Sequence, residues 1–375
     1  MNGEDFRHMA RALRLAERGL YTTHPNPRVG CVLVKDGHVV GEGWHHRAGE
    51  PHAERLALAD AGEAARGATA YVTLEPCCHH GRTPPCTDGL IEAGVARVVA
   101  AMEDPNPLVA GQGFARLREA GVEVQSGVLQ AQAEALNPGF VKRMREGLPF
   151  LRVKLAMSLD GRTAMASGES KWISSEASRR DVQRLRARSS AILTGIGTVL
   201  ADDPSMNVRL DAANLPGRTA DAPVYQPIRV VLDAALRMPP QARMLSLPGQ
   251  TVVLCADEEP LHAARLEAAG ALVVPLPADG DHVNIRAALE YLAEQEINEV
   301  LLEAGATLAG SALQSGLVDE IRLYMAPHLM GDGAHGLFRL PGLARMAQRI
   351  PLEILDLRRI GPDVRFILRP QRSSE

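Results

Sequence analysis

Four residues in the first quarter of the chain could together carry out hydrolytic chemistry. His52 and Glu54 follow Pro51, and Cys77 and Cys86 come later with eight residues between them. One imidazole and two thiolates can hold zinc tetrahedrally and leave its fourth position open for water. Zinc lowers the pKa of that water to roughly 7, and a carboxylate that does not bind the metal can move the proton. We therefore predict a zinc site of His52, Cys77 and Cys86, with Glu54 as the proton shuttle.

The order of these residues favours deamination. A His-x-Glu sequence followed by Pro-Cys and a later Cys is the signature of zinc deaminases, which replace a ring amine by oxygen. A purely structural zinc site is the competing interpretation, because it closes the fourth position with another protein ligand. Cys78, His79 and His80 are available for that role, but a closed site leaves Glu54 without a function.

The elements that must position these residues alternate between strands and helices. An amphipathic helix is predicted first, followed by a hairpin that turns at Asp36-Gly37, then by α/β alternation that places both cysteines at helix starts. The expected elements are a helix over 6–20, strands over 29–34 and 38–43, a helix over 52–61, a strand over 68–74, a helix over 87–93, a strand over 96–101, and helices over 113–120 and 130–145.

A second alternating pattern begins after a break near 146–149. It predicts a helix over 175–188 and a long loop over 211–227, with strands over 151–157, 191–194, 228–232, 251–255, 271–275, 299–303, 320–325 and 364–368, the last two antiparallel. Glycine-bearing loops near Gly195 and Gly305 open helices, where backbone N–H groups suit phosphates. No Gly-x-Gly-x-x-Gly with an acidic partner follows, so a Rossmann fingerprint is absent.

The bulk composition describes a globular protein of two domains. The chain has 375 residues, of which 46% are hydrophobic. Its net charge of −4 and its aromatic content of 3% argue against a basic surface with exposed aromatic rings that binds nucleic acid. Five cysteines and an acidic start with no apolar signal region indicate free thiols and metal ligands in the cytoplasm. No apolar stretch is long enough for a membrane span.

Three segments make the chain similar to a known family. The sequence His24-Pro-Asn-Pro-Arg-Val-Gly-Cys31, the His52–Glu54 motif, and Leu74-Glu-Pro-Cys77 with its long spacing to Cys86 resemble the bifunctional deaminase–reductase of riboflavin biosynthesis. The resemblance runs over essentially the whole chain. It implies a cytidine deaminase-like three-layer α/β/α domain over 1–147 and a dihydrofolate reductase-like α/β domain over 148–375.

The resemblance implies two reactions on one small molecule. Zinc-dependent deamination of 2,5-diamino-6-(5-phosphoribosylamino)pyrimidin-4(3H)-one would precede NADPH-dependent reduction of its ribosyl group to a ribityl chain. It further implies a homo-oligomer, a dimer or tetramer, with neither nucleic acid nor membrane as partner. In the deaminase domain, the residues that match substrate-lining positions are Asn26, His45, Arg82, Asp104 and Asn106.

In the reductase domain the resemblance implies two further sets. Substrate contacts would come from Lys154, Ser170, Arg186, Met206, Arg209 and Glu303. NADPH contacts would come from Ala156, Trp172, Thr198, Asp202 and the loop of Gly305, Ala306, Thr307, Leu308, Ala309, Gly310 and Ser311. Nicotinamide supplies the redox chemistry in such enzymes, and the protein orients it.

Two other functions remain open at this point. One is a tRNA-type nucleic-acid deaminase with an accessory RNA-binding domain, which a basic patch with aromatic residues in the second half would support. The other is a non-catalytic, zinc-stabilised binding protein. Ammonia release that depends on zinc would distinguish an enzyme from it.

Overall fold

The chain folds into two compact units. The computed structural model describes residues 3–79, 84–107, 109–219, 222–257 and 259–371. One unit comprises Met1–Leu148 with Pro216–Thr219, and the other comprises Pro149–Leu215 with Ala220–Glu375. Each unit is described separately below. Among the described residues, no helix combines the length and the apolar character that crossing a membrane requires.

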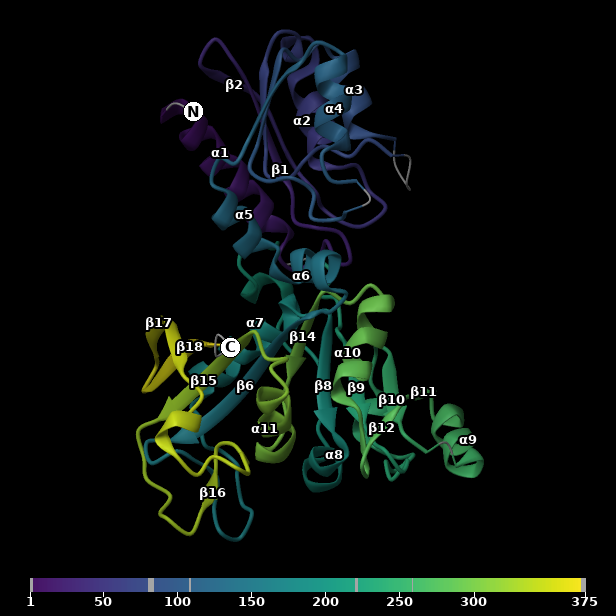
Figure 1. Cartoon of the computed structure of the whole chain (residues 1–375), viewed down its shortest axis with the longest axis vertical. Coiled ribbons are helices and arrows are strands. Elements are labelled where there is room, and N and C mark those ends of the chain that lie inside the picture. Colours follow the sequence, from purple (N-terminus) through teal and green to yellow (C-terminus); the bar gives the residue numbers. More distant parts are fainter. Residues whose placement is uncertain (1–2, 80–83, 108, 220–221, 258, 372–375) are drawn as a thin grey trace. The chain divides into compact units, whose positions relative to one another are not determined.

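The first unit is built on a five-stranded mixed sheet (Figure 1). The strand order is β2-β1-β3-β4-β5; β1 is antiparallel to β2 and β3, and β3, β4 and β5 run parallel. The strands are β1 (Gly30–Lys35), β2 (His38–Trp44), β3 (Thr69–Val72), β4 (Arg97–Ala100) and β5 (Glu123–Ser126). The helices are α1 (Gly3–Ala16), α2 (Ala53–Ala61), α3 (Cys86–Glu92), α4 (Gln112–Glu119), α5 (Gln130–Leu136) and α6 (Pro138–Glu146).

Glycines show that α1 and α2 cover opposite faces of this sheet. A Cβ at Gly30 would lie 2.1 Å from the carbonyl oxygen of Ala12 in α1. A Cβ at Gly43 would lie 2.3 Å from the carbonyl oxygen of Ala53 in α2. Gly43 pairs with Cys31, the residue after Gly30, and successive strand residues point to opposite faces. The sheet is therefore the middle of three layers, as the cytidine deaminase-like expectation requires.

The single helix predicted over 130–145 is wrong. The structure has two helices there, α5 and α6, which meet at Asn137 with φ −119° and ψ 41°. Pro138 lacks a backbone N–H and disfavours helical geometry at the preceding residue, so the helix ends before it and a new one begins. The Asn137 amide accepts a hydrogen bond from Arg28 N (2.8 Å) and donates one to Arg28 O (2.9 Å).

The second unit is built on a nine-stranded sheet with the order β11-β10-β9-β8-β14-β6-β15-β18-β17. Figure 1 shows β17 at one edge and β11, beside α9, at the other. The main strands are β6 (Phe150–Ser158), β8 (Ala191–Gly195), β9 (Ile228–Leu232), β10 (Thr251–Cys255), β11 (Ala271–Pro275), β14 (Glu299–Leu302), β15 (Glu320–Ala326), β17 (Leu352–Ile360) and β18 (Asp363–Pro370). Two small two-stranded antiparallel sheets are also present: β7 (Arg162–Ala164) pairs with the distant β16 (His335–Gly336), and β12 (Ala278–Asp279) forms a hairpin with β13 (His282–Val283).

The helices of this unit are α7 (Glu176–Arg188), α8 (Ile196–Asp202), α9 (Pro260–Ala268), α10 (Ile285–Glu294) and α11 (Ala306–Gln314). Seven neighbouring strands of the sheet, in the spatial order β11-β10-β9-β8-β14-β6-β15, run parallel. The last two, β18 and β17, are antiparallel to their neighbours. The expectation for 320–325 was therefore partly wrong, because β15 pairs parallel to β6 on one side and antiparallel to β18 on the other. Parallel strands place their carboxyl ends at one edge, where ligands bind in such sheets.

A buried ion-pair group joins three central strands. Arg152 of β6 is 1% exposed; its Nη1 lies 3.0 Å from Glu299 of β14 and its Nε lies 2.6 Å from Glu320 of β15. Burial raises the pKa of Glu320, but the charges and hydrogen bonds of Arg152 and Arg322 together outweigh burial and lower that pKa to about 2. Removing one member of such a group leaves an uncompensated buried charge.

We expect Glu320→Gln to destabilise the second unit by about 3 kcal/mol at pH 7. The folded pKa lies below the unfolded pKa of about 4.3, so the ionised group stabilises the fold above that pH. This contribution falls as pH drops from about 4 to about 2. Urea unfolding of parent and variant at several pH values should therefore give curves that differ at pH 7 and converge in acid. A difference that is the same at all pH values would contradict the prediction.

Candidate active site

Three side chains of the first unit gather around one point. The ligand atoms of His52, Cys77 and Cys86 all lie within 4.8 Å of one another. His52 Nδ1 lies 3.5 Å from Cys77 Sγ and 3.3 Å from Cys86 Sγ. In the part of the chain that the structure describes, no fourth His, Cys, Asp or Glu ligand joins this group. One nitrogen and two sulfurs fit zinc with an open fourth position.

Local structure explains how the three donors converge. His52 is the N-cap residue of α2, so the helix begins one residue later than predicted. Cys86 is the first residue of α3, as expected, but Cys77 lies in the loop after β3 instead of at a helix start. Its Sγ nevertheless accepts a hydrogen bond from the backbone N–H of Cys86 (3.4 Å), at the N-terminus of α3. Helix N-termini stabilise thiolates in this way.

The two thiols have opposite pKa shifts. Hydrogen bonding by Cys86 is the main cause that lowers the pKa of Cys77 to about 4, and His52 adds to it. Cys86 donates its thiol proton to Cys77 in a hydrogen bond that the two sulfurs share, and this raises the pKa of Cys86 well above its ordinary value. Cys77 is thus prepared as a thiolate ligand, and a metal that replaces the shared proton would make Cys86 the second.

Glu54 sits beside the donors without belonging to them. Its side chain is 3% exposed, and its buried Oε2 has no hydrogen-bond partner among the residues that the structure describes. Burial, followed by the charge of Cys77, raises the pKa of Glu54 to about 7. A buried carboxylate oxygen that no protein group satisfies is suited to a water or a substrate proton. A carboxyl group with a pKa near neutrality can both take up and release that proton.

Arg55 locks the two ligand-bearing helices together, and the sequence reasoning missed it. Its Nη2 donates to the carbonyl oxygen of Pro85 (2.6 Å), the residue before Cys86. The Arg55 guanidinium also lies against α3 so closely that a Cβ at Gly89 would sit 2.5 Å from Nη1. The sequence signal is weak, since Arg55 follows Glu54 directly but carries no ligand atom.

Asn26 and His45 lie together next to the metal group. The ring of His45 is 5.2 Å from that of His52, and its Nδ1 lies 3.2 Å from Pro51 O. Because a carbonyl only accepts, Nδ1 carries the proton; Nε2 then accepts from the Asn26 amide nitrogen at 3.0 Å. Burial lowers the pKa of His45, which favours this neutral form. The pair fixes the direction in which the Asn26 amide faces.

Two of the remaining predicted substrate residues of this unit, Asp104 and Asn106, follow β4. Asp104 accepts a hydrogen bond from the backbone N–H of Asn106 (2.9 Å). Burial is the main cause that raises the pKa of Asp104 to about 6, and the charges of Glu75 and Cys77 act in the same direction. Arg82 lies outside the described residues, as does His80 of the alternative structural site.

In the second unit, three predicted substrate residues form one charged group. Arg186 makes a bidentate ion pair with Glu303, with Nε–Oε1 2.6 Å and Nη2–Oε2 2.9 Å. Burial raises the pKa of Glu303, but Arg186 outweighs it and the net pKa is lowered. Burial lowers the pKa of Lys154, which also feels the charges of Glu303 and Arg186. Lys154 lies on β6, next to the β14 strand that ends before Glu303.

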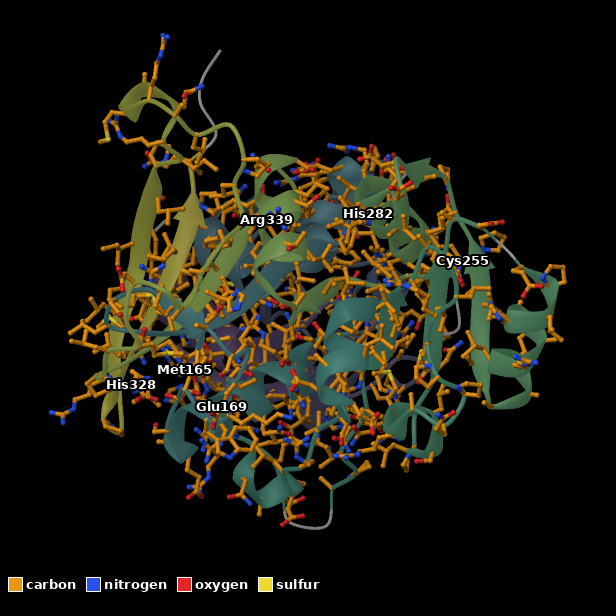
Figure 2. All side chains as sticks on the ribbon, turned by 90° about the horizontal axis from the view of Figure 1, so that it is seen from below. Met165, Glu169, Cys255, His282, His328 and Arg339 are labelled. Carbon is orange, nitrogen blue, oxygen red and sulfur yellow. The ribbon has the colours of Figure 1, made fainter. Side chains whose placement is uncertain are left out.

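Met206 and Arg209 are linked to this group through Asn207, which the sequence reasoning did not single out. The Asn207 carbonyl accepts from Arg186 Nη1 (3.0 Å), and its side-chain oxygen accepts from Arg209 Nη1 (3.1 Å). Burial and the charge of Arg186 lower the pKa of Arg209. Ser170 instead follows the turn of Met165 and Glu169 labelled in Figure 2, where Met165 N donates to Glu169 O (2.8 Å).

Most of the predicted cofactor residues follow the carboxyl ends of β8 and β14. A Cβ at Gly195, the end of β8, would lie 3.2 Å from Leu308 Cδ2, so the starts of α8 and α11 are neighbours. Lys171, beside Trp172, pairs with Asp202 at 2.9 Å. The predicted loop 305–311 is in fact Gly305 followed by the first residues of α11. The backbone N–H of Arg339, labelled in Figure 2, donates to Ala306 O in this helix at 3.0 Å. Ala156 is in β6, and Thr198 is in α8.

Comparison with known proteins gives two family matches. The family described as the RibD C-terminal domain matches residues 149–366. The family described as the cytidine and deoxycytidylate deaminase zinc-binding region matches residues 3–102. The first match covers more than half of the chain.

Full-length relatives and solved structures are also similar to this chain. Riboflavin biosynthesis protein RibD of Escherichia coli K12 is 53% identical over 363 residues, 96% of this chain and 98% of the relative. RibD of Haemophilus influenzae is 50% identical over 372 residues, 99% of this chain and 98% of the relative. The RibD structure from Acinetobacter baumannii superposes with a TM-score of 0.89 at 46% identity, covering 98% of this chain and 99% of that one.

A further solved structure carries a functional description. A diaminohydroxyphosphoribosylaminopyrimidine deaminase/5-amino-6-(5-phosphoribosylamino)uracil reductase from Thermotoga maritima superposes with a TM-score of 0.84 at 33% identity. The match covers 98% of this chain and 99% of that chain. Both units therefore have their counterparts in one relative.

Proposed function

The chain belongs to the RibD family of riboflavin biosynthesis proteins, and from this premise we propose how its own residues serve the two reactions. It is a bifunctional enzyme, a pyrimidine deaminase fused to a reductase. Its substrate is 2,5-diamino-6-(5-phosphoribosylamino)pyrimidin-4(3H)-one, and the deaminated product is the substrate of the reductase.

For the deaminase, His52, Cys77 and Cys86 hold zinc. The ion, when bound, supplies a water of lowered pKa for attack on the amine-bearing ring carbon. Glu54 would take one proton from the attacking water and deliver it to the ring nitrogen, and it would then carry the second proton of that water to the amine, which leaves as ammonia. The observation that supports this most is the buried Oε2 of Glu54, which has no partner in the described part of the chain and lies beside three donors that no fourth described ligand joins.

The residues around the metal group bind the pyrimidine. We assign Asn26, oriented by His45, and Asp104 with Asn106 to the polar edge of the ring, and Arg82 to the ribose phosphate. A neutral His45 fits this assignment, because its fixed tautomer holds one orientation of the Asn26 amide.

For the reductase, NADPH supplies the hydride when bound. We assign the cofactor to the start of α11 (Gly305 to Ser311) with Thr198, Asp202, Trp172 and Ala156. The substrate set is Lys154, Ser170, Arg186, Met206, Arg209 and Glu303. Lys154 and Glu303 orient the ribosyl group, and the buried Arg186–Glu303 pair keeps that carboxylate ionised. The cationic Arg209 is suited to the 5′-phosphate.

One incubation tests both activities. Purified protein with zinc, NADPH and the diaminopyrimidine ribotide should convert it through successive mass gains of about 1 and about 2 units. The first gain is amine-for-oxygen exchange with ammonia release, and the second is hydride reduction. Without NADPH the reaction should stop after the first gain. An unchanged ribotide would refute the proposal, and strict preference for NADH would refute the cofactor assignment.

We further propose a small-molecule enzyme of the cytoplasm that needs no nucleic acid. The net charge of −4 and the low aromatic content do not suit a polyphosphate-binding platform. None of its five cysteines, all of which lie in the described residues, forms a disulfide, and this suits a reducing compartment. The domain boundary at 147/148 belongs to the same proposal.

A homo-oligomer is the remaining part of the proposal, and β17 is the surface that we assign to it. This nine-residue strand forms the outer edge of the sheet and exposes Leu352, Ile354, Leu355 and Leu357. Exposed apolar edge strands pair readily with another chain. A second copy of the chain, which carries the same edge, is the occupant we propose.

The oligomer predicts a mass change in a variant. Ile354→Lys should shift the sedimentation mass of the purified chain to that of a monomer, because a lysine at a long exposed edge strand opposes pairing. Sedimentation equilibrium measures it, with Leu261→Lys, an exposed leucine in α9, as the matched control. A parent protein that sediments as a monomer would refute the oligomer.

A further inference from the structure

Glu75 is a buried carboxylate that neither the zinc group nor the predicted substrate set uses. It stands two residues before Cys77 and is 4% exposed. Its carboxylate accepts three backbone hydrogen bonds, from Asp104 N (3.0 Å), Gly111 N (3.0 Å) and Phe114 N (3.2 Å). One side chain therefore holds both ends of the segment that leads from β4 to α4.

The chemistry of this contact requires a carboxylate. Three N–H groups converge on two oxygens, and only an acceptor without protons of its own satisfies all three. Gly111 is the N-cap residue of α4 and offers no side chain for that role. Glu75 caps α4 from another part of the chain, where a negative charge is favoured.

The first turn of α4, into which the segment leads, also lies directly against the loop that carries Cys77. A Cβ at Gly113 would lie 2.1 Å from the carbonyl oxygen of Pro76, the residue between Glu75 and Cys77. On the other side, Glu75 N donates to Met102 O (3.0 Å), which extends the pairing of the strands. The segment thus has little room to shift against the loop that carries Cys77.

The first part of the segment carries two groups assigned to the substrate. Asp104 accepts from Asn106 N, and Asn106 O accepts from Val109 N (3.0 Å) and Ala110 N (2.9 Å). Asp104 and Asn106 therefore belong to one hydrogen-bonded turn. Glu75 holds this turn through the hydrogen bond that it accepts from the backbone N–H of Asp104.

We propose that Glu75 is a positioning residue of the deaminase, which fixes Asp104 and Asn106 relative to the metal ligand Cys77. It touches no substrate. Glu75 connects the turn proposed to bind the pyrimidine edge to the loop that carries Cys77. The position of the bound pyrimidine relative to Cys77 is thereby fixed. This inference rests on the substrate roles proposed above for Asp104 and Asn106.

The test is Glu75→Gln in the full-length chain. The amide keeps the volume but turns an N–H₂ group toward the backbone donors, so at least one of the three bonds is lost. We expect unchanged zinc content, unchanged reductase kinetics, and a KM for the diaminopyrimidine ribotide raised about 10- to 100-fold, with a smaller change in kcat. The matched control is Glu259→Gln, since Glu259 accepts two backbone N–H groups at the start of α9.

Two results overturn the inference. Unchanged kcat/KM would show that the anchor has no effect on the substrate. A loss of activity that follows a loss of zinc would show that Glu75 only supports the metal loop. The variant Glu75→Asp keeps the carboxylate on a shorter side chain, and we expect it to recover part of the lost affinity.

A double-mutant cycle with Asp104→Asn separates this inference from the proposed function. Asp104→Asn alone should raise KM, and it should raise KM less when Glu75→Gln is already present, because both changes act on one contact. Additive effects would refute the coupling. If Asp104→Asn alone leaves KM unchanged, the proposed role of Asp104 is wrong. If Asp104→Asn raises KM and Glu75→Gln does not, only the inference about Glu75 is wrong.

Discussion

Glu54→Gln should lower the rate of ammonia release by roughly 10²–10⁴-fold while the chain keeps its zinc. The amide cannot accept the proton that the carboxylate transfers, but it has nearly the same shape and is not a ligand. Because Glu54 is 3% exposed, water from the bulk has little access to replace it. Ammonia release under saturating ribotide, with zinc measured in the same samples, gives the result.

Two controls accompany this variant. Reduction of the deaminated pyrimidine by NADPH should proceed at the parental rate in Glu54→Gln, since the reductase has its own unit. Glu63→Gln, at an exposed glutamate just after α2, should deaminate normally. Full turnover by Glu54→Gln would remove Glu54 from the chemical step.

Cys86→Ser should abolish deamination by a different route, through loss of the metal. A hydroxyl is a poor zinc donor, and only His52 and Cys77 would remain of the three ligands. After dialysis, zinc should fall from about one ion per chain to roughly a tenth of that or less. Metal analysis and ammonia release should decline together, and excess zinc should restore little activity.

Cys78→Ser is the matched control for this experiment. Cys78 is adjacent to Cys77 but does not belong to the metal group, so its replacement should leave zinc and activity intact. Equal zinc in Cys86→Ser and the parent would contradict the ligand set. Lost zinc in Cys78→Ser would instead assign a metal role to the neighbouring thiol.

The zinc group could be predicted from the sequence because its chemistry is tied to residue type. Few side chains bind zinc, and a strand between His52 and Cys77 is enough to bring them to one edge of the sheet. The same applies to Glu54, which is confined to the first turn of α2. Local sequence was thus enough to predict the three donors that the structure brings together and the buried carboxylate beside them.

The supporting contacts could not be predicted in this way. Arg55 and Glu75 act by hydrogen bonds to backbone atoms 30 and 29 to 39 positions away in the sequence, at Pro85 and at Asp104, Gly111 and Phe114. Backbone atoms are the same in every residue, so such partners leave no pattern of residue types. Glu75 directly before Pro76-Cys77 was the only local signal.

The fold shows the same limit. Strands such as 228–232, 251–255 and 271–275 were predicted with the observed bounds, since each is a short apolar run. Strand β17 was not predicted, because Ile354-Leu355 and Arg358-Arg359 interrupt the alternation of apolar and charged residues, and this edge strand has no buried face to mark it. The direction of β15 depends on its pairing with β6 and β18, which local periodicity does not report.

The close approach of the Arg55 guanidinium to Gly89 bears on how such enzymes can be identified and altered. A chain that kept every donor and the acid, but carried a larger residue at 89, would hold the complete motif while the Arg55 guanidinium was displaced from its position beside α3 and from the carbonyl oxygen of Pro85. The presence of Arg55 and Gly89 together with the three donors and Glu54 is therefore a better criterion for a working deaminase site than the donors and Glu54 alone. In redesign, positions 55 and 89 should be changed together, for instance to a shorter basic residue at 55 and a bulkier residue at 89.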